Sequence, residues 1–269
     1  MPILLQGDCL EVMRDLSDHS VDCFICDLPY GQLSGPKIGG QANIRLDKDR
    51  CAWDVKIDLA AFWVQVKRLS RNDHTPVLMF CNTKFGIDLI NSNPSWFRYD
   101  LVWDKGRGVS FLLANKMPMK SHEMIYVFSK KGTFYNRVDI PTDKPNWVID
   151  RSKEKTEMSR QYGAAHSATR SIESSKDGLR CALSVIQAIS SVKSGKHPTE
   201  KPISLYTWLL ERYCPTGGTV LDPTAGSFNA ILAAEALGFH GIGIEKDEKF
   251  FKTGCAKFAD PSGNIIEII

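Results

Sequence analysis

Short apolar runs alternate with segments of helical periodicity along the chain. The runs that have the length and composition of buried strands are residues 3–6, 21–26, 76–81, 99–103, 123–129, 219–222 and 241–245. Apolar residues recur at helical spacing in 10–16 and 203–214, and the alanine-rich segment 228–237 has a high helix propensity. Asp8, with Glu11 three residues later, is placed to cap the first of these helices. Strands that alternate with helices predict an α/β fold with a mostly parallel sheet and helices on both faces.

Two segments interrupt this alternation. Residues 31–52 contain four glycines and a proline, a composition that predicts a mobile loop. Residues 136–196 are polar and lack apolar periodicity, and between 151 and 180 the basic residues outnumber the acidic ones by 7 − 4 = 3. A basic polar segment of this kind is compatible with a solvated linker or with a binding region.

Length and composition narrow the class of protein. The chain of 269 residues is long enough for one large α/β domain with an insertion. No apolar stretch approaches the roughly 18 residues of a membrane-spanning helix, so we expect a soluble, intracellular protein without a membrane partner. Cysteines and histidines are scattered, and the CxxC pair Cys23 and Cys26 lies inside a strand-like run, which indicates a structural pair and no metal site. A net charge of +3 permits a nucleic-acid partner without requiring one.

Residues 219–248 have the pattern of one βαβ unit with an acidic residue at the end of each strand. The first strand ends on Asp222, the turn Pro-Thr-Ala-Gly and a helix follow, and the second strand ends on Glu245. Acids at the carboxyl ends of neighbouring strands lie where open α/β sheets bind ligands, and this spacing suits an acid that meets ribose hydroxyls. The turn contains a single glycine, Gly226, which disfavours a bound pyrophosphate. A cofactor with a ribose and no phosphate fits better, although an ordinary strand–turn–helix corner shares the pattern.

A second acidic motif, Asp27-Leu28-Pro29-Tyr30, follows the apolar run 21–26. Taken alone, an aspartate and a proline at such a place are typical of a helix cap and a turn. Together with residues 219–248, the motif makes the chain resemble the amino-methyltransferases that modify exocyclic nitrogens of DNA bases with S-adenosylmethionine. DLPYG resembles their catalytic (D/N/S)PP(Y/F) motif, and LDPTAGS resembles their cofactor-binding DPFxGSG motif.

The order of the motifs resembles the permuted β group of this family. HPTEKP at 197–202 is similar to the segment that precedes the cofactor motif there, and GDCLEVM near the N-terminus and residues 120–132 also fit. The resemblance covers 1–135 and 197–258. Two departures from the family pattern are Leu28, which replaces the first proline of the catalytic motif, and Phe228-Asn229, which stand where glycine and threonines are common.

The resemblance implies how the first motif would act. Asp27 would accept one hydrogen of the target amino group, the backbone carbonyl of Leu28 would accept the other, and Tyr30, which follows Pro29, would stack on a base flipped out of the duplex. Leucine in place of proline retains the carbonyl and gives up a fixed φ angle. In this family an acid at the first motif position usually accompanies adenine. The expected product is therefore N6-methyladenine, with N4-methylcytosine as the alternative.

The resemblance also implies a set of cofactor-binding residues. They are Asp8, Lys201, Asp222, Pro223, Thr224, Gly226, Ser227 and Glu245. Among them, Asp8 would lie near the adenine of S-adenosylmethionine and Lys201 near its methionine carboxylate. Helix capping alone would also explain Asp8.

For the whole chain, the resemblance predicts a Rossmann-like class I methyltransferase domain with a circularly permuted motif order. Residues 1–135 would form its catalytic half, 136–196 an inserted target-recognition region, and 197–269 its cofactor-binding half. The implied partner is double-stranded DNA with a flipped target base. The chain would act as a monomer or a homodimer in the cytoplasm, as part of a bacterial or phage-encoded restriction–modification system.

Other functions fit the sequence less well. A 5-methylcytosine enzyme needs a nucleophilic cysteine, which follows proline in its family, and the chain contains no Pro-Cys dipeptide. The permuted order and HPTEKP weigh against an RNA or protein-glutamine methyltransferase. A catalytically inactive DNA-binding relative remains an alternative.

Overall fold

The computed structural model describes residues 2–31, 55–109, 111, 114–143, 178–187 and 200–258. The chain divides into two compact units, one made of Met1–Asn136 with Ser184–Ile269 and the other of Arg137–Leu183. The first unit contains the main sheet and the described α-helices.

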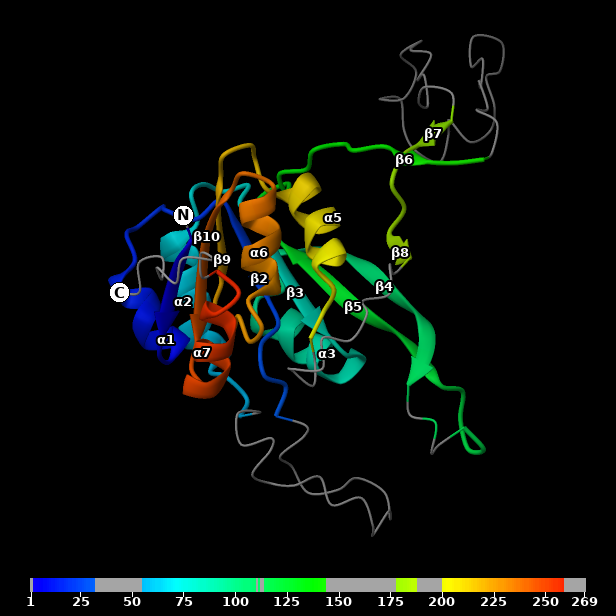
Figure 1. The fold of residues 1–269 in the computed structure, drawn as a ribbon, viewed down its shortest axis with the longest axis horizontal. Coiled ribbons are helices and arrows are strands. Elements are labelled where there is room, and N and C mark those ends of the chain that lie inside the picture. Colours follow the sequence, from blue (N-terminus) through cyan, green and yellow to red (C-terminus); the bar gives the residue numbers. More distant parts are fainter. Residues whose placement is uncertain are drawn as a thin grey trace. The chain divides into compact units, whose positions relative to one another are not determined.

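The first unit is built on an eight-stranded sheet (Figure 1). In spatial order its strands are β1 (Ile3–Gln6), β10 (His240–Glu245), β9 (Thr219–Asp222), β2 (Cys23–Cys26), β3 (Val77–Cys81), β5 (Lys120–Phe128), β4 (Phe97–Val109) and β8 (Val185–Gln187). Neighbours from β1 to β3 are parallel, β5 is antiparallel to both β3 and β4, and β8 is parallel to β4. The predicted mixed, mostly parallel sheet is confirmed.

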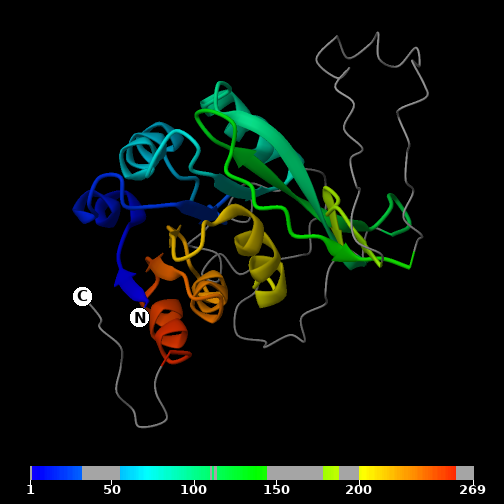
Figure 2. The same ribbon diagram turned by 90° about the horizontal axis from the view of Figure 1, so that it is seen from above.

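Helices cover both faces of this sheet, as Figure 2 shows. They are α1 (Cys9–Val12), which continues into a 3₁₀ turn over Met13–Asp15, α2 (Leu59–Leu69), α3 (Thr83–Ser92), α5 (Ile203–Tyr213), α6 (Asn229–Ala236) and α7 (Glu248–Cys255). Successive residues of β2 face opposite layers: Phe24 packs in a core cluster with α2 and α3, and Ile25 in a cluster with α5 and α6. Because both faces are buried, a continuous apolar run encodes the strand.

The predicted strands and helices are present, with some differences at their ends. β4 and β5 both begin earlier than predicted, and β4 also ends later. Asp8 caps α1, as predicted, by accepting a hydrogen bond of 3.0 Å from the backbone N–H of Leu10. Cys23 and Cys26 are buried free thiols in clusters on opposite faces of the sheet, and burial raises the pKa of each. They are structural residues and cannot bind one metal ion together.

The direction of strand addition reverses between β9 and β2. From β9 the chain passes through α6 to β10 on one side, whereas from β2 it passes through α2 to β3 on the other side. Parallel strands place their carboxyl ends at one edge, and such a reversal opens a crevice there. Asp27 directly follows β2 and Asp222 ends β9, so both acidic motifs lie at this reversal.

The second unit is described in part. Within it, β6 (Ile140–Pro141) and β7 (Leu179–Arg180) form a two-stranded antiparallel sheet. Most of the predicted recognition region, residues 32–52 of the predicted loop and the first three residues of HPTEKP lie outside the described residues. In the part of the chain that is described, no helix has the length and apolar character needed to cross a membrane.

Candidate active site at the carboxyl edge of the sheet

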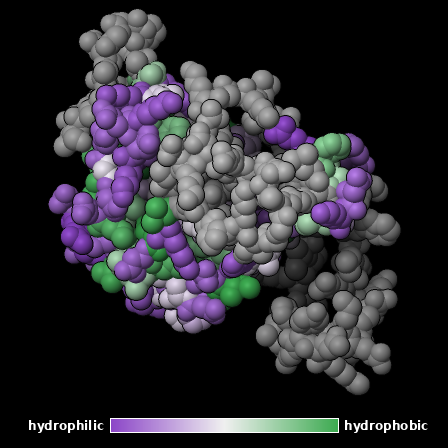
Figure 3. All heavy atoms as spheres, turned by 90° about the horizontal axis from the view of Figure 1, so that it is seen from below, coloured by the Kyte–Doolittle hydropathy of each residue, from purple (hydrophilic) through white to green (hydrophobic). Residues whose placement is uncertain are grey.

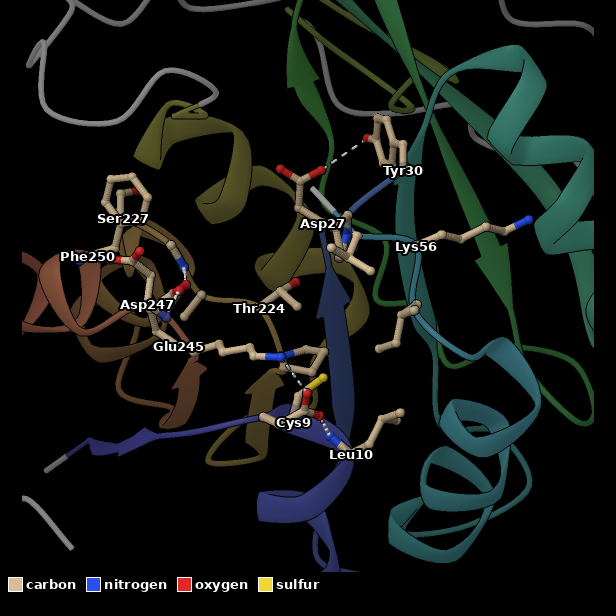
Figure 4. A pocket seen from close by; sticks show the side chains of 18 of the residues that line it. Cys9, Leu10, Asp27, Tyr30, Lys56, Thr224, Ser227, Glu245, Asp247 and Phe250 are labelled. Carbon is tan, nitrogen blue, oxygen red and sulfur yellow. Dashed lines mark hydrogen bonds and ion pairs between the residues drawn. The ribbon is translucent and has the colours of Figure 1, made fainter. Parts of the chain in front are cut away.

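A cavity of about 820 Å³ lies at the carboxyl edge of the sheet, and both predicted motifs line it. The predicted site residues in its wall are Asp8, Asp27, Pro29, Tyr30, Lys201, Pro223, Thr224, Gly226, Ser227 and Glu245. Figure 4 shows Asp27 and Tyr30 on one side of the cavity and Glu245 on the other. The two remaining predicted residues, Leu28 and Asp222, are buried and do not line it.

The carboxylate of Asp27 is held by two partners. Its Oδ1 accepts a hydrogen bond of 3.1 Å from the Tyr30 hydroxyl, and its Oδ2 accepts one from Lys201 Nζ. The Tyr30 ring stacks on Phe85 of α3, with ring centroids 4.8 Å apart. Burial and the neighbouring charge of Asp27 raise the pKa of Tyr30, so its hydroxyl stays protonated and donates. Asp27 is thus a preorganised hydrogen-bond acceptor in the cavity wall.

Lys201 is a buried cation among anions. Besides its contact with Asp27, its Nζ lies 3.9 Å from Glu123 and 4.5 Å from the ring centroid of Phe80. Burial alone would lower the pKa of Lys201, but the charges of Asp27 and Glu123 outweigh it and raise the pKa. Lys201 is therefore charged at neutral pH. The sequence predicts this lysine near the cofactor carboxylate, whereas in the structure its ammonium group contacts the Asp27 motif.

Glu123 belongs to the site although the sequence did not single it out. It lies on β5, lines the cavity and forms an ion pair with Lys105. Burial would raise the pKa of Glu123, but the charges of Lys201 and Lys105 outweigh burial and lower it. The resemblance to the family covers residues 120–132 as a whole and does not point to one residue among them. A single acid within a strand has no neighbouring motif from which a role in a site could be predicted.

Glu245 organises the opposite side of the cavity. Its Oε2 accepts a hydrogen bond of 2.7 Å from the N–H of Gly226, and its Oε1 accepts one of 2.8 Å from the N–H of Asp247. Burial raises the pKa of Glu245, and these backbone donors oppose the increase. Each carboxylate oxygen keeps a further lone pair, so Glu245 can also accept hydrogen bonds from ligand hydroxyls. Gly226 has a φ of 49°, which glycine adopts without strain.

Asp222 is buried at the end of β9. Its Oδ1 accepts a hydrogen bond of 3.1 Å from the N–H of Thr224. Burial raises the pKa of Asp222 to about 8, with the hydrogen bond from Thr224 opposing the increase and the charges of Asp27 and Glu245 adding to it. A carboxyl group that keeps its proton near neutral pH can donate a hydrogen bond as well as accept one.

Asp8 combines helix capping with an ion pair. Its Oδ1 caps α1 and its Oδ2 accepts a hydrogen bond of 3.0 Å from Lys246 Nζ. Burial would raise the pKa of Asp8, but the hydrogen bonds from Lys246 and Leu10 outweigh it and lower the pKa. The capping role is confirmed, and the contact with a cofactor adenine stays a prediction.

Phe228 explains one departure from the family pattern. Its φ of 59° and ψ of 20° are the left-handed conformation that glycine favours, and its fully buried ring packs against Phe251. Gly243 makes room for this ring, since a Cβ there would lie 2.8 Å from it. Phe228 thus keeps the backbone conformation expected of glycine, and its side chain fills the core beside the turn 223–226.

A polar latch joins the segment 223–229, which contains the predicted cofactor-binding turn, to the segment that carries Lys201. The latch consists of Asn229, Glu200 and Lys257. The Asn229 side-chain amide donates to the Lys201 carbonyl at 2.8 Å and to Glu200 at 3.0 Å. Lys257 Nζ donates to the Asn229 side-chain oxygen at 2.8 Å, to the Ser227 carbonyl at 2.7 Å and to Glu200 at 3.2 Å. This latch fixes the two segments relative to each other within the cavity wall.

The sheet order, the cavity at the strand reversal and the two motifs that face it define a Rossmann-like methyltransferase domain. The sequence model of the N6/N4 DNA methylase family, described as DNA methylase, matches residues 21–256, and the chain belongs to this family. The resemblance stated from the motifs is therefore confirmed.

Individual relatives agree with this assignment. The type II methyltransferase M.HinfI of Haemophilus influenzae is 24% identical over 288 residues, which cover 99% of this chain and 71% of M.HinfI. The PvuII DNA methyltransferase, which is cytosine-N4-specific, superposes with a TM-score of 0.63 at 14% identity, covering 96% of this chain and 86% of its own.

A second solved structure contains the expected cofactor. TTHA0409 of Thermus thermophilus, a candidate DNA modification methylase complexed with S-adenosyl-L-methionine, superposes over 100% of both chains with a TM-score of 0.57 at 19% identity. These superpositions confirm the predicted class I methyltransferase fold. S-adenosylmethionine, the cofactor that the motifs indicate, is the ligand of that structural neighbour.

Proposed function

We propose that the chain is a site-specific DNA methyltransferase that transfers a methyl group from S-adenosylmethionine to N6 of an adenine flipped out of the duplex. The observation that carries this proposal is the single cavity shared by Asp27 on one side and Glu245 on the other. One side offers acceptors for an amino group and the other offers acceptors for ribose hydroxyls. A volume of about 820 Å³ lies in the upper part of the range for ligand sites and suits a cofactor together with a base.

For the cofactor we propose the set Asp8, Lys201, Asp222, Pro223, Thr224, Gly226, Ser227 and Glu245. Two backbone N–H groups fix the Glu245 carboxylate and leave lone pairs for hydroxyls, which supports a contact with the ribose. Bound S-adenosylmethionine supplies an activated methyl group. Protonated Lys201 and the acids around it form a charged wall that suits a zwitterionic amino-acid moiety.

For the target base we propose Asp27, the carbonyl of Leu28, Pro29 and Tyr30. The lone pair of an exocyclic amino group is delocalised into the ring, and acceptors that hold both amino hydrogens favour the nucleophilic geometry. Asp27 is already oriented by Tyr30 and Lys201, so little reorganisation is needed when the base arrives. Its negative charge also stabilises positive charge that grows on the nitrogen during transfer.

The choice of adenine rests on the chemistry of Asp27. A carboxylate accepts a stronger, charge-assisted hydrogen bond than the hydroxyl group that usually accompanies cytosine in this family. The likeness to a cytosine-N4-specific enzyme means that the fold itself favours neither base. Nucleoside mass spectrometry of treated DNA tests the choice, and we expect N6-methyladenine. N4-methylcytosine alone would select the other base, and the absence of both products would favour an inactive DNA-binding relative.

Two substitutions separate the roles of the two sides of the cavity. Asp27→Ala should abolish methyl transfer and leave S-adenosylmethionine affinity within about twofold, because Asp27 faces the base and Lys201 keeps Glu123 as an anionic neighbour. Glu245→Ala should weaken cofactor binding at least tenfold, since a hydrogen bond to a charged group contributes about 1.5–3 kcal/mol. Calorimetry measures the cofactor affinity of both variants, and a methyl-transfer assay on DNA measures the activity of the Asp27 variant. An unchanged affinity of the Glu245 variant would contradict the assignment.

We propose further that residues 136–196 read the target sequence. Their position between the two halves of the domain, their basic surplus and the separate compact unit Arg137–Leu183 support this proposal. Clustered basic residues of this kind suit contacts with DNA phosphates that position a protein on the duplex.

A further inference from the structure

The hairpin formed by β4 and β5 runs beyond the end of β3. The last residue of β3, Cys81, pairs with Met124 of β5, whereas β5 begins at Lys120 and β4 continues to Val109. Because β5 is antiparallel to β3, its first residues project from the carboxyl edge at which Asp27 lies. The described residues of this segment, 104–109, 111 and 114–120, are called the hairpin below and lie at the lower right of Figure 1.

The hairpin concentrates positive charge. Its charged residues are Asp104, Lys105, Arg107, Lys116 and Lys120, a surplus of 4 − 1 = 3. The whole chain has a net charge of +3, so the remainder of the chain is balanced. Arg107 and Lys116 are exposed. A local surplus of this kind attracts a polyanion.

The hairpin also exposes large apolar side chains to water. The exposed fractions are 78% for Phe111, 53% for Met117 and 40% for Met119, and Phe111 is the most exposed large hydrophobic residue in the described part of the chain. On the face shown in Figure 3, which is seen from below, groups of hydrophobic side chains are interspersed with hydrophilic ones among the coloured residues. Exposed apolar groups gathered on one projecting element indicate a binding partner.

The base of the hairpin is joined to the wall of the cavity. Lys105 forms an ion pair with Glu123, and its Nζ lies 5.1 Å from the ring centroid of Trp103. Glu123 lines the cavity and lies 3.9 Å from Lys201, the partner of Asp27. A ligand bound along the hairpin therefore adjoins the cavity.

We propose that the hairpin is a DNA-contact surface separate from the 136–196 region: Arg107 and Lys116 bind phosphates, and Phe111 enters the base stack beside the flipped nucleotide. This inference rests on the proposed function. Proteins that distort the duplex combine cationic contacts to the backbone with an apolar wedge between bases, and the hairpin presents both. DNA fits better than a lipid surface or a protein, because the hairpin leaves the sheet at the edge where the target base must enter.

Salt-dependent binding of a labelled 30-base-pair duplex of mixed sequence to the full chain tests the phosphate contacts. Arg107→Ala combined with Lys116→Ala should make the slope of log affinity against log salt shallower by roughly 1.8, about 0.9 for each phosphate that is no longer bound. Lys130→Ala combined with Lys131→Ala is the matched control, since these lysines follow the opposite end of β5 and pair with Asp73. Its slope should equal that of the wild type. An unchanged slope for the hairpin variant would overturn the proposal.

Phe111→Ala tests the wedge through methyl transfer to native and heat-denatured plasmid DNA from a methylase-deficient host. We expect the ratio of the rate on native DNA to the rate on denatured DNA to fall roughly tenfold. The variant can no longer stack on a base in the gap that the flipped nucleotide leaves in a duplex, whereas a single strand has no such gap. Phe111→Trp should keep the wild-type ratio, and Val64→Ala, an exposed apolar residue on α2, serves as the control. An equal loss of rate on both substrates would overturn the wedge. So would an unchanged ratio of rates together with a loss of self-association, since Phe111 would then contact a second copy of the chain. A wild type that methylates neither substrate would contradict the proposed function instead, and the binding slopes would still decide the hairpin.

Discussion

Asp27 has its carboxylate held by a phenol three residues away and by an ammonium group from a distant part of the chain. Tyr30 and Lys201 each donate to one of its oxygens, and the Tyr30 ring is itself fixed against Phe85. This arrangement separates two functions of Tyr30. Its hydroxyl orients the acid, and the proposed role of its ring is to stack on the target base.

Two substitutions of Tyr30 should therefore have different kinetic effects. Tyr30→Phe keeps the ring against Phe85 and removes the donor to Asp27, so we expect kcat to fall about tenfold with little change in KM for DNA. Tyr30→Ala removes the ring as well and should also raise KM for DNA, since base–aromatic stacking contributes about 1–3 kcal/mol. Steady-state kinetics on unmethylated plasmid DNA distinguishes the two. Identical parameters for both variants would contradict a stacking role for the ring.

Asp222 should make the stability of the cofactor-free protein depend on pH. Its pKa is 3.8 in the unfolded reference and about 8 in the folded state. Below the lower value both states hold the proton, and between the two values only the folded state does, so the free energy of unfolding falls as pH rises towards 8 and then levels off. Asp222→Asn cannot ionise and should gain stability relative to the wild type from pH 5 to 8. Urea unfolding at several pH values measures this difference, and a pH-independent difference would refute the shifted pKa.

At the scale of elements, the polar latch couples the start of α5, the start of α6 and the residues that follow α7. The side chains of Lys257 and Glu200 are only 21% and 14% exposed, and Lys257 makes three hydrogen bonds. A partly buried ion pair that loses one partner leaves the other without compensation.

Lys257→Met should lower the free energy of unfolding by about 2–4 kcal/mol, because it removes the charged partner of Glu200 and the lysine donor to the Asn229 side-chain oxygen and the Ser227 carbonyl. Lys252→Met is the matched control on α7: its lysine is 72% exposed and pairs with Glu248 four residues earlier. That pair should contribute only a few tenths of a kcal/mol. Chemical unfolding of both variants tests the contrast, and equal losses would mean that the latch is not a stabilising unit.

The sequence pattern was sufficient to predict the inner strands of the sheet, because each of them is buried on both faces and is therefore a continuous apolar run. It was weaker for α3, where Gly86 interrupts the apolar periodicity: a Cβ there would lie 2.7 Å from the Tyr126 ring, so packing requires glycine. The paired acids Asp222 and Glu245 were visible because they end adjacent strands. The contact of Lys201 with Asp27 was not, since it joins residues 174 positions apart and depends on how α5 packs against the sheet.

At the scale of the whole molecule, the permuted motif order leaves the sheet intact. The N-terminal strand β1 pairs in parallel with β10, so the first described strand of the chain completes the half of the sheet that the C-terminal segment builds. Asp27 and Glu245 thereby reach one cavity from opposite ends of the sequence. None of the described residues that line this cavity belongs to the unit Arg137–Leu183, which fits the proposed division between chemistry and target recognition.

Such a division predicts that changes in the inserted region alter DNA binding and spare the cofactor. Replacing Arg160, Arg170 and Arg180 with alanine should weaken duplex binding and make its salt dependence shallower by about 0.9 for each phosphate that the variant no longer binds. S-adenosylmethionine affinity should stay the same, because the described residues that line the cavity lie in the first unit. Anisotropy measurements over a range of salt concentrations, with calorimetry as the control for the cofactor, test both expectations. An unaltered salt slope would reduce residues 136–196 to a linker and would leave target recognition to other DNA-contacting surfaces such as the hairpin.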